Sequence, residues 1–351
     1  MVIHREKDGN KCSELISVII HRSIPVKLSA LEELANNLWW CWNEEAVDLF
    51  KSIDPLQWML TRHNPIALLD KISLNRYKEL ENDEEFVARL AAVYAKFSQY
   101  MEEKKQMNDP SIAYFSMEYG LHASLKIYSG GLGVLAGDYL KEASDKKTKI
   151  TGIGLLYRYG YFTQKFSAAG NQEAEYEAQD FTKIPVSPAR DAEGNWLTIS
   201  LSFPGREVYA RIWQVNVGRV ELYMMDTDFE DNQEGDRSIT HYIWRGLGKS
   251  FETGNFVGYR EPALRKLNIQ ADVYHCNEGH AAFTGLERLR EYVAEDQLSF
   301  TEAMEVVRAS SLFTTHTPVP AGHDSFTENL LKNYFWFVAE RLKITWEQLL
   351  G

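Results

Sequence analysis

The chain has 351 residues, of which 44% are hydrophobic and 13% are aromatic. That length and composition suffice for one large or two ordinary domains with a sizeable core, which excludes a disordered chain. A formal net charge of −12, without a dense block of lysine and arginine, excludes nucleic acid or an anionic membrane surface as the main partner.

The first hundred residues have mostly helical patterns. Ser29 and Glu32 predict a capping box, and the run A-L-E-E-L-A-N-N-L-W-W-C-W that follows predicts a helix. A second helix is predicted from about Asp83. Four apolar residues recur on one face of this second helix: Phe86, Leu90, Val93 and Phe97.

Three tryptophans lie close together in the first predicted helix. Trp39, Trp40 and Trp42 could stack on sugar rings, but aromatic clusters within an amphipathic helix usually belong to the core. We therefore expect these side chains to be buried.

From Ser111 the pattern changes to strand, helix and strand. I-A-Y-F-S-M and I-T-G-I-G-L-L-Y predict two buried strands, and between them a glycine-rich turn precedes an amphipathic helix. Because Gly130, Gly131 and Gly133 have no Cβ, backbone N–H groups at the helix start can approach an anion. The same pattern also occurs in plain tight connections. The loop fits neither G-x-G-x-x-G nor a nucleoside triphosphate loop, so ordinary dinucleotide and ATP sites are disfavoured.

Three alternating segments lie between Trp196 and Asp226 and are joined at Pro204-Gly205 and at Gly218, which predicts an antiparallel insertion. Further on, A-D-V-Y-H-C-N predicts a strand that leads into a helix from about Glu278, and S-L-F-T-T-H predicts another strand. Strands that end in polar residues are where open α/β sheets build their sites.

The three cysteines, Cys12, Cys41 and Cys276, are odd in number and widely spaced, which is typical of reduced thiols in a cytoplasmic protein. No signal-peptide pattern is present, and no apolar run approaches the roughly 18 residues of a membrane span. We expect a soluble cytoplasmic protein. No histidine or cysteine has the spacing of metal ligands, so no metal is expected.

Four segments then agree with one another: Y-F-S-M-E-Y-G at residues 114–120, Y-S-G-G-L-G-V-L-A-G-D at 128–138, H-C-N-E-G-H-A-A-F at 275–283 and F-T-T-H-T-P-V-P-A-G-H-D at 313–324. In this order and spacing they resemble the N-terminal half of bacterial α-glucan phosphorylases, in the branch with an extra helical segment in front. The resemblance covers roughly Ser29 to the end of the chain.

The resemblance implies an α/β fold in which two Rossmann-like domains face each other, the GT-B arrangement. Residues 1–108 are then a helical N-terminal segment, and residues 109–351 are the first Rossmann-like domain, truncated at its C-terminus, with the second domain missing. The family's reaction is reversible phosphorolysis of glycogen, starch or maltodextrin to glucose 1-phosphate. It depends on pyridoxal phosphate, which is bound mainly by a lysine of the second domain that no segment here matches.

The resemblance also assigns residues. Gly130 and Gly131 match the turn whose amides face the substrate phosphate and the cofactor phosphate, and Glu118 matches an acidic residue that lines the cleft. For Glu118, a helix cap or a surface carboxylate is the alternative. His316 matches the histidine whose carbonyl and ring contact the glucosyl unit as positive charge develops.

Asn277 and His280 match the N-x-x-H segment of the family's cleft, where they would hold sugar hydroxyls or a neighbouring loop. A structural role is equally open, because Asn277 also suits the N-cap of the helix that follows. The implied partners are α-1,4-glucan and phosphate or glucose 1-phosphate, with a homo-oligomer possible.

Residues 243–261 depart from the family's pattern. They read I-W-R-G-L-G-K-S-F-E-T-G-N-F-V-G-Y-R-E, without helical or strand periodicity. Codons permitted for these residues, read one nucleotide later, can spell Y-G-G-D-W-E-N-R-L-K-Q-E-I-L-L-G-I-G, which is the family's loop and core helix. We interpret the segment as the product of compensating frameshifts, with a genuine glycine-rich loop as the alternative.

Two other functions remain open. A glycogen or starch synthase also carries a G-G-L-G loop, but usually at the very start of the chain behind a lysine, whereas Ser129 precedes Gly130 here. A catalytically silent glucan-binding fragment is the third hypothesis. With one wall of the cleft and no cofactor lysine, the fragment alone is expected to be inactive.

Overall fold

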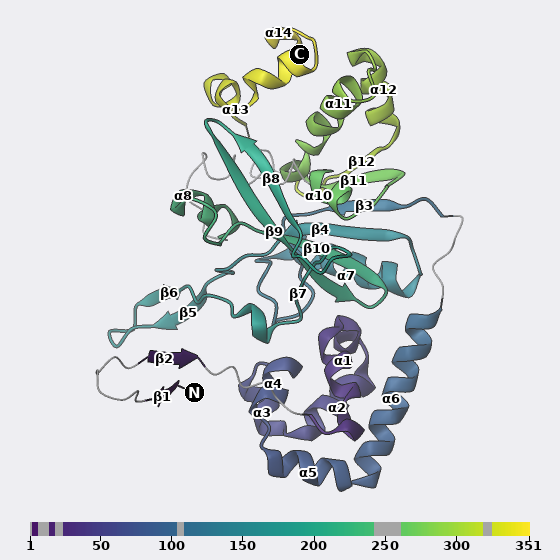
Figure 1. Cartoon of the computed structure of the whole chain (residues 1–351), viewed down its shortest axis with the longest axis vertical. Helices are drawn as coiled ribbons and strands as arrows, with labels where there is room; N and C mark the ends of the chain where they lie inside the picture. The colour runs from purple at the N-terminus through teal and green to yellow at the C-terminus, as the bar shows by residue number, and fades with distance from the viewer. Residues whose placement is uncertain (1, 6–13, 18–23, 104–108, 242–260, 319–324) are drawn as a thin grey trace.

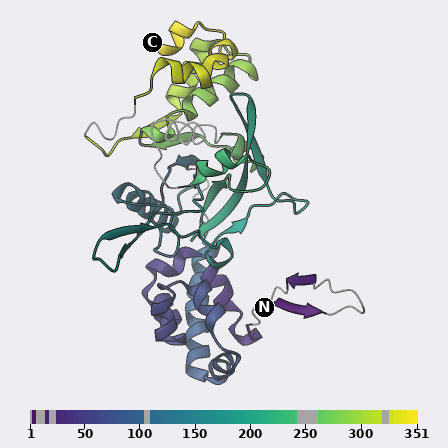
Figure 2. The same cartoon turned by 90° about the vertical axis from the view of Figure 1, so that its left-hand side faces the viewer.

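The computed structural model describes six stretches of the chain: residues 2–5, 14–17, 24–103, 109–241, 261–318 and 325–351. The protein has a mixed α/β architecture. Three tiers follow one another along the long axis: a helical segment, a central sheet and a group of helices near the C-terminal residue (Figures 1 and 2). The proposed frame change covers residues 243–261, of which 243–260 lie outside the described stretches.

The helical segment of residues 24–103 has its own apolar core. Its long helix α6 buries Phe86, Leu90, Val93 and Phe97, the four residues predicted from the period. The elements of the segment are η1 (Val26–Leu28), α1 (Ala30–Asn36), η2 (Leu38–Trp42), α2 (Glu44–Ile53), α3 (Pro55–Leu60), α4 (Pro65–Lys71), α5 (Leu74–Asn82) and α6 (Glu84–Glu102).

The predicted capping box at Ser29 is wrong. The Ser29 N–H donates to the carbonyl of Val26 at 3.2 Å, so Ser29 already has helical backbone angles and its side chain caps nothing. The predicted helix is also interrupted at Asn37, whose extended backbone separates α1 from η2. The expectation for the tryptophans is confirmed for Trp39 and Trp40, which are only 4% and 2% exposed.

The central sheet contains eight of the described strands, in the order β12-β11-β3-β4-β10-β9-β7, with β8 paired to β9. The five strands from β12 to β10 are parallel, and α7 (Gly131–Asp145) connects β3 to β4. The bounds are β3 (Ile112–Phe115), β4 (Ile150–Leu155), β7 (Ser187–Pro188), β8 (Thr198–Phe203), β9 (Arg206–Val217), β10 (Val220–Asp226), β11 (Val273–Asn277) and β12 (Ser311–Thr314).

The antiparallel pairing predicted between Trp196 and Asp226 is confirmed, since β8, β9 and β10 pair in this way. Gly205 and Gly218 make the two turns with φ of +70° and +59°, where a residue with a side chain would be strained. These strands form no separate insertion, however, because β10 also pairs with β4 in parallel. The antiparallel strands therefore extend the parallel sheet.

The C-terminal helices form a third apolar cluster on the far side of the sheet from the helical segment (Figure 1). The helix predicted from Glu278 begins later, because a 3-10 turn precedes α11.

The remaining elements are β1 (Val2–Arg5), β2 (Glu14–Ser17), β5 (Thr163–Phe166), β6 (Gln172–Glu175), η3 (Phe181–Lys183), α8 (Glu234–Arg237), η4 (Ser238–Thr240), α10 (Glu261–Lys266), η5 (Gly279–Ala281), α11 (Thr284–Ala294), α12 (Phe300–Ala309), α13 (Glu328–Arg341) and α14 (Trp346–Leu350).

Candidate functional site

The predicted site residues follow three neighbouring parallel strands. β11 pairs with β3 on one side and with β12 on the other, and Asn277 at the end of β11 is in register with Thr314 at the end of β12. Because parallel strands present their carboxyl ends at one edge of a sheet, the segments after β3, β11 and β12 meet there.

Asn277 and His316 are in direct contact. Asn277 is fully buried, and its Oδ1 lies 3.0 Å from Nε2 of His316. Its Nδ2 donates to Oγ of Ser116 at 3.2 Å. The predicted N-cap role of Asn277 is wrong, because this residue ends β11 and neither η5 nor α11 is capped by its side chain. Its amide instead joins the segments after β3 and β12.

Glu278 anchors the segment that carries His316. Its carboxylate accepts hydrogen bonds from the backbone N–H of His316 and from the hydroxyls of Thr315 and Thr317, the latter two at 3.3 and 3.2 Å. Burial raises the pKa of Glu278, but the bonds from His316, Thr317 and Thr315 outweigh it and hold the pKa below its usual range. The backbone of Glu278 has φ of +61° and ψ of 176°, a region that glycine occupies almost alone.

His280 holds a neighbouring loop. Its Nε2 accepts a hydrogen bond from the backbone N–H of Met117 at 3.1 Å, so the proton of the neutral ring is on Nδ1. The carbonyl of Met117 in turn accepts from the hydroxyl of Tyr157 at 3.0 Å. Of the two roles expected for His280, this contact favours the one of fixing a loop.

Glu118 connects the end of β3 to the glycine turn. Its Oε2 accepts from the backbone N–H of Ser129 at 3.2 Å, and its Oε1 accepts from the Ser129 hydroxyl at 3.3 Å. The N-cap of α7 is Gly130, so Glu118 bonds to the residue that precedes the cap. Its carboxylate therefore fixes the entry to the turn.

The glycine turn offers an open backbone surface. Gly130 and Gly131 are exposed, and a Cβ added to either would meet no atom within 4 Å. Gly133 differs, because its Cβ would lie 2.4 Å from Cβ of Tyr128 and 2.9 Å from Oε2 of Glu118. The first N–H groups of a helix have no acceptor within it and carry partial positive charge. The first two glycines thus present an anion-attracting surface, and the third permits close packing.

One serine links the two halves of this arrangement. Oγ of Ser116 accepts from Nδ2 of Asn277 and donates to the carbonyl of Glu118 at 2.9 Å. The structure brings His316, Asn277 and Ser116 together directly, whereas Gly130 and Gly131 are joined to them through Glu118 and Ser129.

Comparison with known proteins identifies relatives along most of the chain. A maltodextrin phosphorylase from Thermococcus litoralis is 41% identical over 316 residues, which are 88% of this chain and 38% of that protein. A glycogen phosphorylase from Mycobacterium tuberculosis is 38% identical over 336 residues, covering 90% of this chain and 39% of the relative. The chain is a relative of the α-glucan phosphorylases. The resemblance expected from the four sequence segments is therefore confirmed.

The similarity to α-glucan phosphorylases covers part of those proteins. A glycogen phosphorylase from Aquifex aeolicus is 38% identical over 319 residues, which are 88% of this chain and 45% of the relative. The chain thus spans about two fifths of the length of the curated relatives it matches. A family model described as "Protein of unknown function (DUF3417)" matches residues 24–125, which include the whole described helical segment, β3 and the first ten residues of the loop after it.

The sequence did not predict two residues of this candidate site. Ser116 follows β3 directly and is fully buried, and Glu278 lies between two residues that were singled out. For Ser116, the available signal is a small polar residue at a strand end. For Glu278, the decisive feature is its backbone angle, which has no signature in the local sequence.

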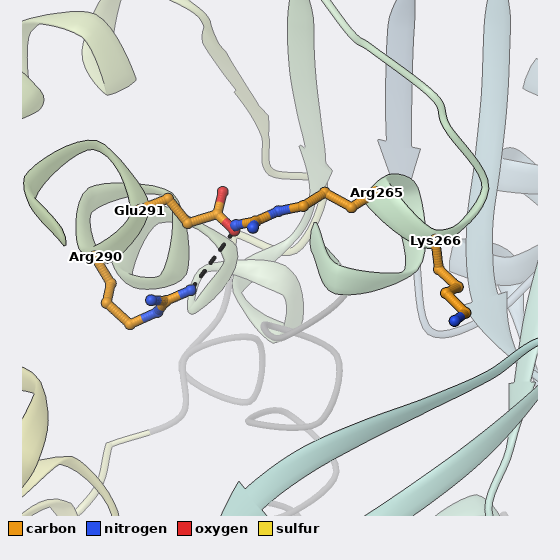
Figure 3. Close-up of a pocket in the computed structure, with 4 residues that line it drawn as sticks. All are labelled: Arg265, Lys266, Arg290 and Glu291. Carbon is orange, nitrogen blue, oxygen red and sulfur yellow. Dashed lines mark ion pairs between the residues drawn. The ribbon is translucent and has the colours of Figure 1, made fainter. Parts of the chain in front are cut away.

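A separate cavity of about 320 Å³ lies between α10 and α11 and is lined by Arg265, Lys266, Arg290 and Glu291 (Figure 3). Arg265 pairs with Glu291 and Glu295, and Arg290 also lies near Glu291 at 3.6 Å. None of the predicted site residues lines this cavity. Both of its arginines are paired with the carboxylates of Glu291 and Glu295. Within the described stretches, no helix has the length and apolar character needed to cross a bilayer.

Proposed function

We propose that this chain is part of an α-glucan phosphorylase that converts α-1,4-glucan and phosphate reversibly to glucose 1-phosphate. The carrying observation is that the Asn277–His316 pair and the open glycine turn belong to one hydrogen-bonded edge of the sheet. The reaction brings a phosphate anion to an uncharged sugar. It therefore needs polar side chains that contact the sugar and a surface that attracts the anion. The phosphorylase relatives support this reading over a synthase.

The proposal includes the finer fold. Residues 109–351 would form the first Rossmann-like domain of a GT-B enzyme, and residues 1–108 a segment in front of it that is helical apart from the paired strands β1 and β2. Five adjacent parallel strands, with α7 crossing between β3 and β4, support that description. Apart from Leu38, the buried residues of the sheet core follow residue 108 and those of the helical core precede it, which supports a boundary near residue 108.

Each site residue has a proposed role. Gly130 and Gly131 face phosphate with backbone N–H groups and the positive end of α7. His316 contacts the glucosyl unit through its ring and carbonyl, and the carbonyl dipole stabilises positive charge that develops on the sugar. Asn277 orients the His316 ring, since its Oδ1 lies 3.0 Å from Nε2 of His316. Glu118 keeps the glycine turn in place through Ser129.

Pyridoxal phosphate is the proposed cofactor, and the residues of this chain fit its phosphate group. The open surface at Gly130 and Gly131, where no atom lies within 4 Å of an added Cβ, leaves space for a phosphate against the backbone. When bound, the cofactor supplies a phosphate that acts as acid and base. The two glycines would hold negative charge there, and His316 would keep the sugar in position.

The proposed partners are α-1,4-glucan and phosphate or glucose 1-phosphate, and a homo-oligomer stays a prediction. A cytoplasmic location is part of the same proposal. Cys41 carries a free thiol, which supports a reducing compartment.

The test uses the full-length protein that contains these residues, purified with pyridoxal phosphate. We expect release of glucose 1-phosphate from maltodextrin or glycogen that depends on added phosphate. Glucosyl transfer from a nucleotide sugar is measured in parallel, because that activity belongs to the synthase alternative. Transfer from the nucleotide sugar without phosphate-dependent release would overturn the proposal.

A further inference from the structure

The short helix η2 belongs to two cores at once. Leu38 is fully buried in the core of the sheet, whereas Trp39 and Trp40 are buried in the core of the helical segment. Cys41 and Trp42 pack against both cores. Residues 38–42 are therefore the joint between the helical segment and the α/β part of the chain.

This joint contacts the loop between β3 and α7. The rings of Trp40 and His122 meet edge to face, with centroids 4.7 Å apart, and the Cys41 thiol donates to the carbonyl of Leu121 at 3.7 Å. Nδ1 of His122 accepts from the backbone N–H of Ser124 at 3.1 Å. Burial, together with the nearby charges of Lys141 and His63, lowers the pKa of His122 to about 4, so the ring is neutral near pH 7.

The same loop packs against the first turns of α7 without intervening side chains. The Gly120 N–H donates to the carbonyl of Gly133 at 2.6 Å. A Cβ on Gly120 would lie 2.8 Å from Cα of Val134, and one on Gly137 would lie 2.4 Å from the carbonyl oxygen of Gly120. Because this contact is backbone on backbone, a shift of the loop must shift the first turns of α7, which begin with the glycine turn.

The helical segment also holds the other end of α7. Arg219 donates to the carbonyl of Ser144, in the last turn of α7, at 2.8 Å and to the carbonyl of Tyr100 in α6 at 2.5 Å. Asn37 exchanges two hydrogen bonds with the backbone of Gly218, at 2.9 and 3.0 Å. The helix that carries the glycine turn is thus linked to residues 24–103 at both ends, through the loop of residues 120–122 at its start and through Arg219 at its end.

We propose that the helical segment of residues 24–103 is a brace that positions the glycine turn, with His122 as the positioning residue that transmits the contact. The effect on phosphate rests on the function proposed above. The family model of unknown function matches the segment, β3 and the loop up to residue 125, so it includes both the segment and His122, but not the glycine turn. The proposed role of the helical segment is to position the glycine turn without contacting phosphate itself.

Three variants of the full-length protein test the brace. His122→Ala removes the ring between Trp40 and the loop, and His122→Phe restores a ring without the Nδ1 acceptor. Leu80→Ala is the control, because Leu80 is 1% exposed in the core of the helical segment, on α5 at the end farthest from the sheet (Figure 1). Two properties are measured: hydrogen exchange of peptides covering residues 117–134, and KM for phosphate with kcat.

We expect His122→Ala to accelerate exchange in this peptide and to raise KM for phosphate by about five- to tenfold, with kcat changed by less than about twofold, since small misplacements of binding groups have large kinetic effects. His122→Phe should stay close to the parent. Leu80→Ala should lower the melting temperature and leave both properties unchanged. Unchanged exchange in His122→Ala, or an equal rise of KM in Leu80→Ala, would overturn the proposal.

The two proposals fail separately. If the parent protein shows no phosphorolysis, the proposed function is wrong, but the exchange experiment still decides whether the helical segment holds the glycine turn. If phosphorolysis is present and exchange in His122→Ala is unchanged, the brace alone is wrong.

Discussion

Replacement of Glu278 tests the anchor of the His316 segment. Glu278→Ala removes an acceptor of three hydrogen bonds, those from the N–H of His316 and the hydroxyls of Thr315 and Thr317. A hydrogen bond to a charged group contributes about 1.5–3 kcal/mol. Because Thr315 and His316 are exposed and regain water when the carboxylate is lost, we expect a net destabilisation of about 2 kcal/mol.

The backbone angles of Glu278 predict which of two variants, Glu278→Gly or Glu278→Ala, is more stable. At φ of +61° and ψ of 176°, a residue with a side chain carries about 1–3 kcal/mol of strain. Glu278→Gly relieves that strain and costs about 0.5–1 kcal/mol through the freedom of glycine in the unfolded chain. We therefore expect Glu278→Gly to be more stable than Glu278→Ala by about 1 kcal/mol, the reverse of the usual order.

Glu278→Gln adds a pH test. The pKa of Glu278 is lowered in the folded protein, so its ionised form stabilises the fold above the ordinary glutamate pKa of about 4.3. This contribution disappears as pH falls through the folded-state pKa. Denaturant unfolding at several pH values should therefore show a difference between parent and Glu278→Gln that is constant near pH 7 and shrinks below about pH 4. A difference independent of pH, or Glu278→Ala as stable as Glu278→Gly, would refute the reasoning.

Four further outcomes are expected. Gly131→Val should block the approach of phosphate, and phosphorolysis within about twofold of the parent would contradict this. Gly133→Ala should lower the melting temperature, because the new Cβ would lie 2.4 Å from Cβ of Tyr128. His316→Ala should lower kcat by about 10²-fold while bound pyridoxal phosphate, measured by absorbance, is retained. Replacing residues 243–261 by the shifted-frame sequence should raise the melting temperature, because it restores a helical apolar period.

Periodic features were predictable from the sequence and long-range pairings were not. Phe86 and Leu90 are 4% and 2% exposed, as a 3.6-residue period requires, because helix burial follows from local spacing. The cap predicted at Ser29 failed because an earlier 3-10 turn had already started the helix. The pairing of β10 with β4 joins segments far apart in the chain, and no local pattern encodes such a choice.

The same distinction applies to the candidate site. The meeting of Asn277 and His316 could be predicted, because neighbouring parallel strands deliver their ends to one edge of the sheet. The role of Glu278 as the anchor of the His316 segment could not be predicted, because it depends on a positive φ that a glutamate rarely adopts. The roles of Gly130 and Gly131 stay predictions, although the open space around both agrees with them.

Two opposite charges lie at this edge of the sheet: the carboxylate of Glu278 and the positive end of α7. Glu278 is 5% exposed, and its carboxylate accepts hydrogen bonds from the backbone N–H of His316 and from the hydroxyls of Thr315 and Thr317, which outweigh the effect of burial, lower its pKa and favour the charged form beside the His316 segment. The start of α7 carries partial positive charge beside Gly130. Phosphorolysis brings an anion to a sugar carbon that becomes positive. If the proposed sites are right, donors for phosphate at one end of this edge and negative potential near the sugar at the other would stabilise both charges where they develop.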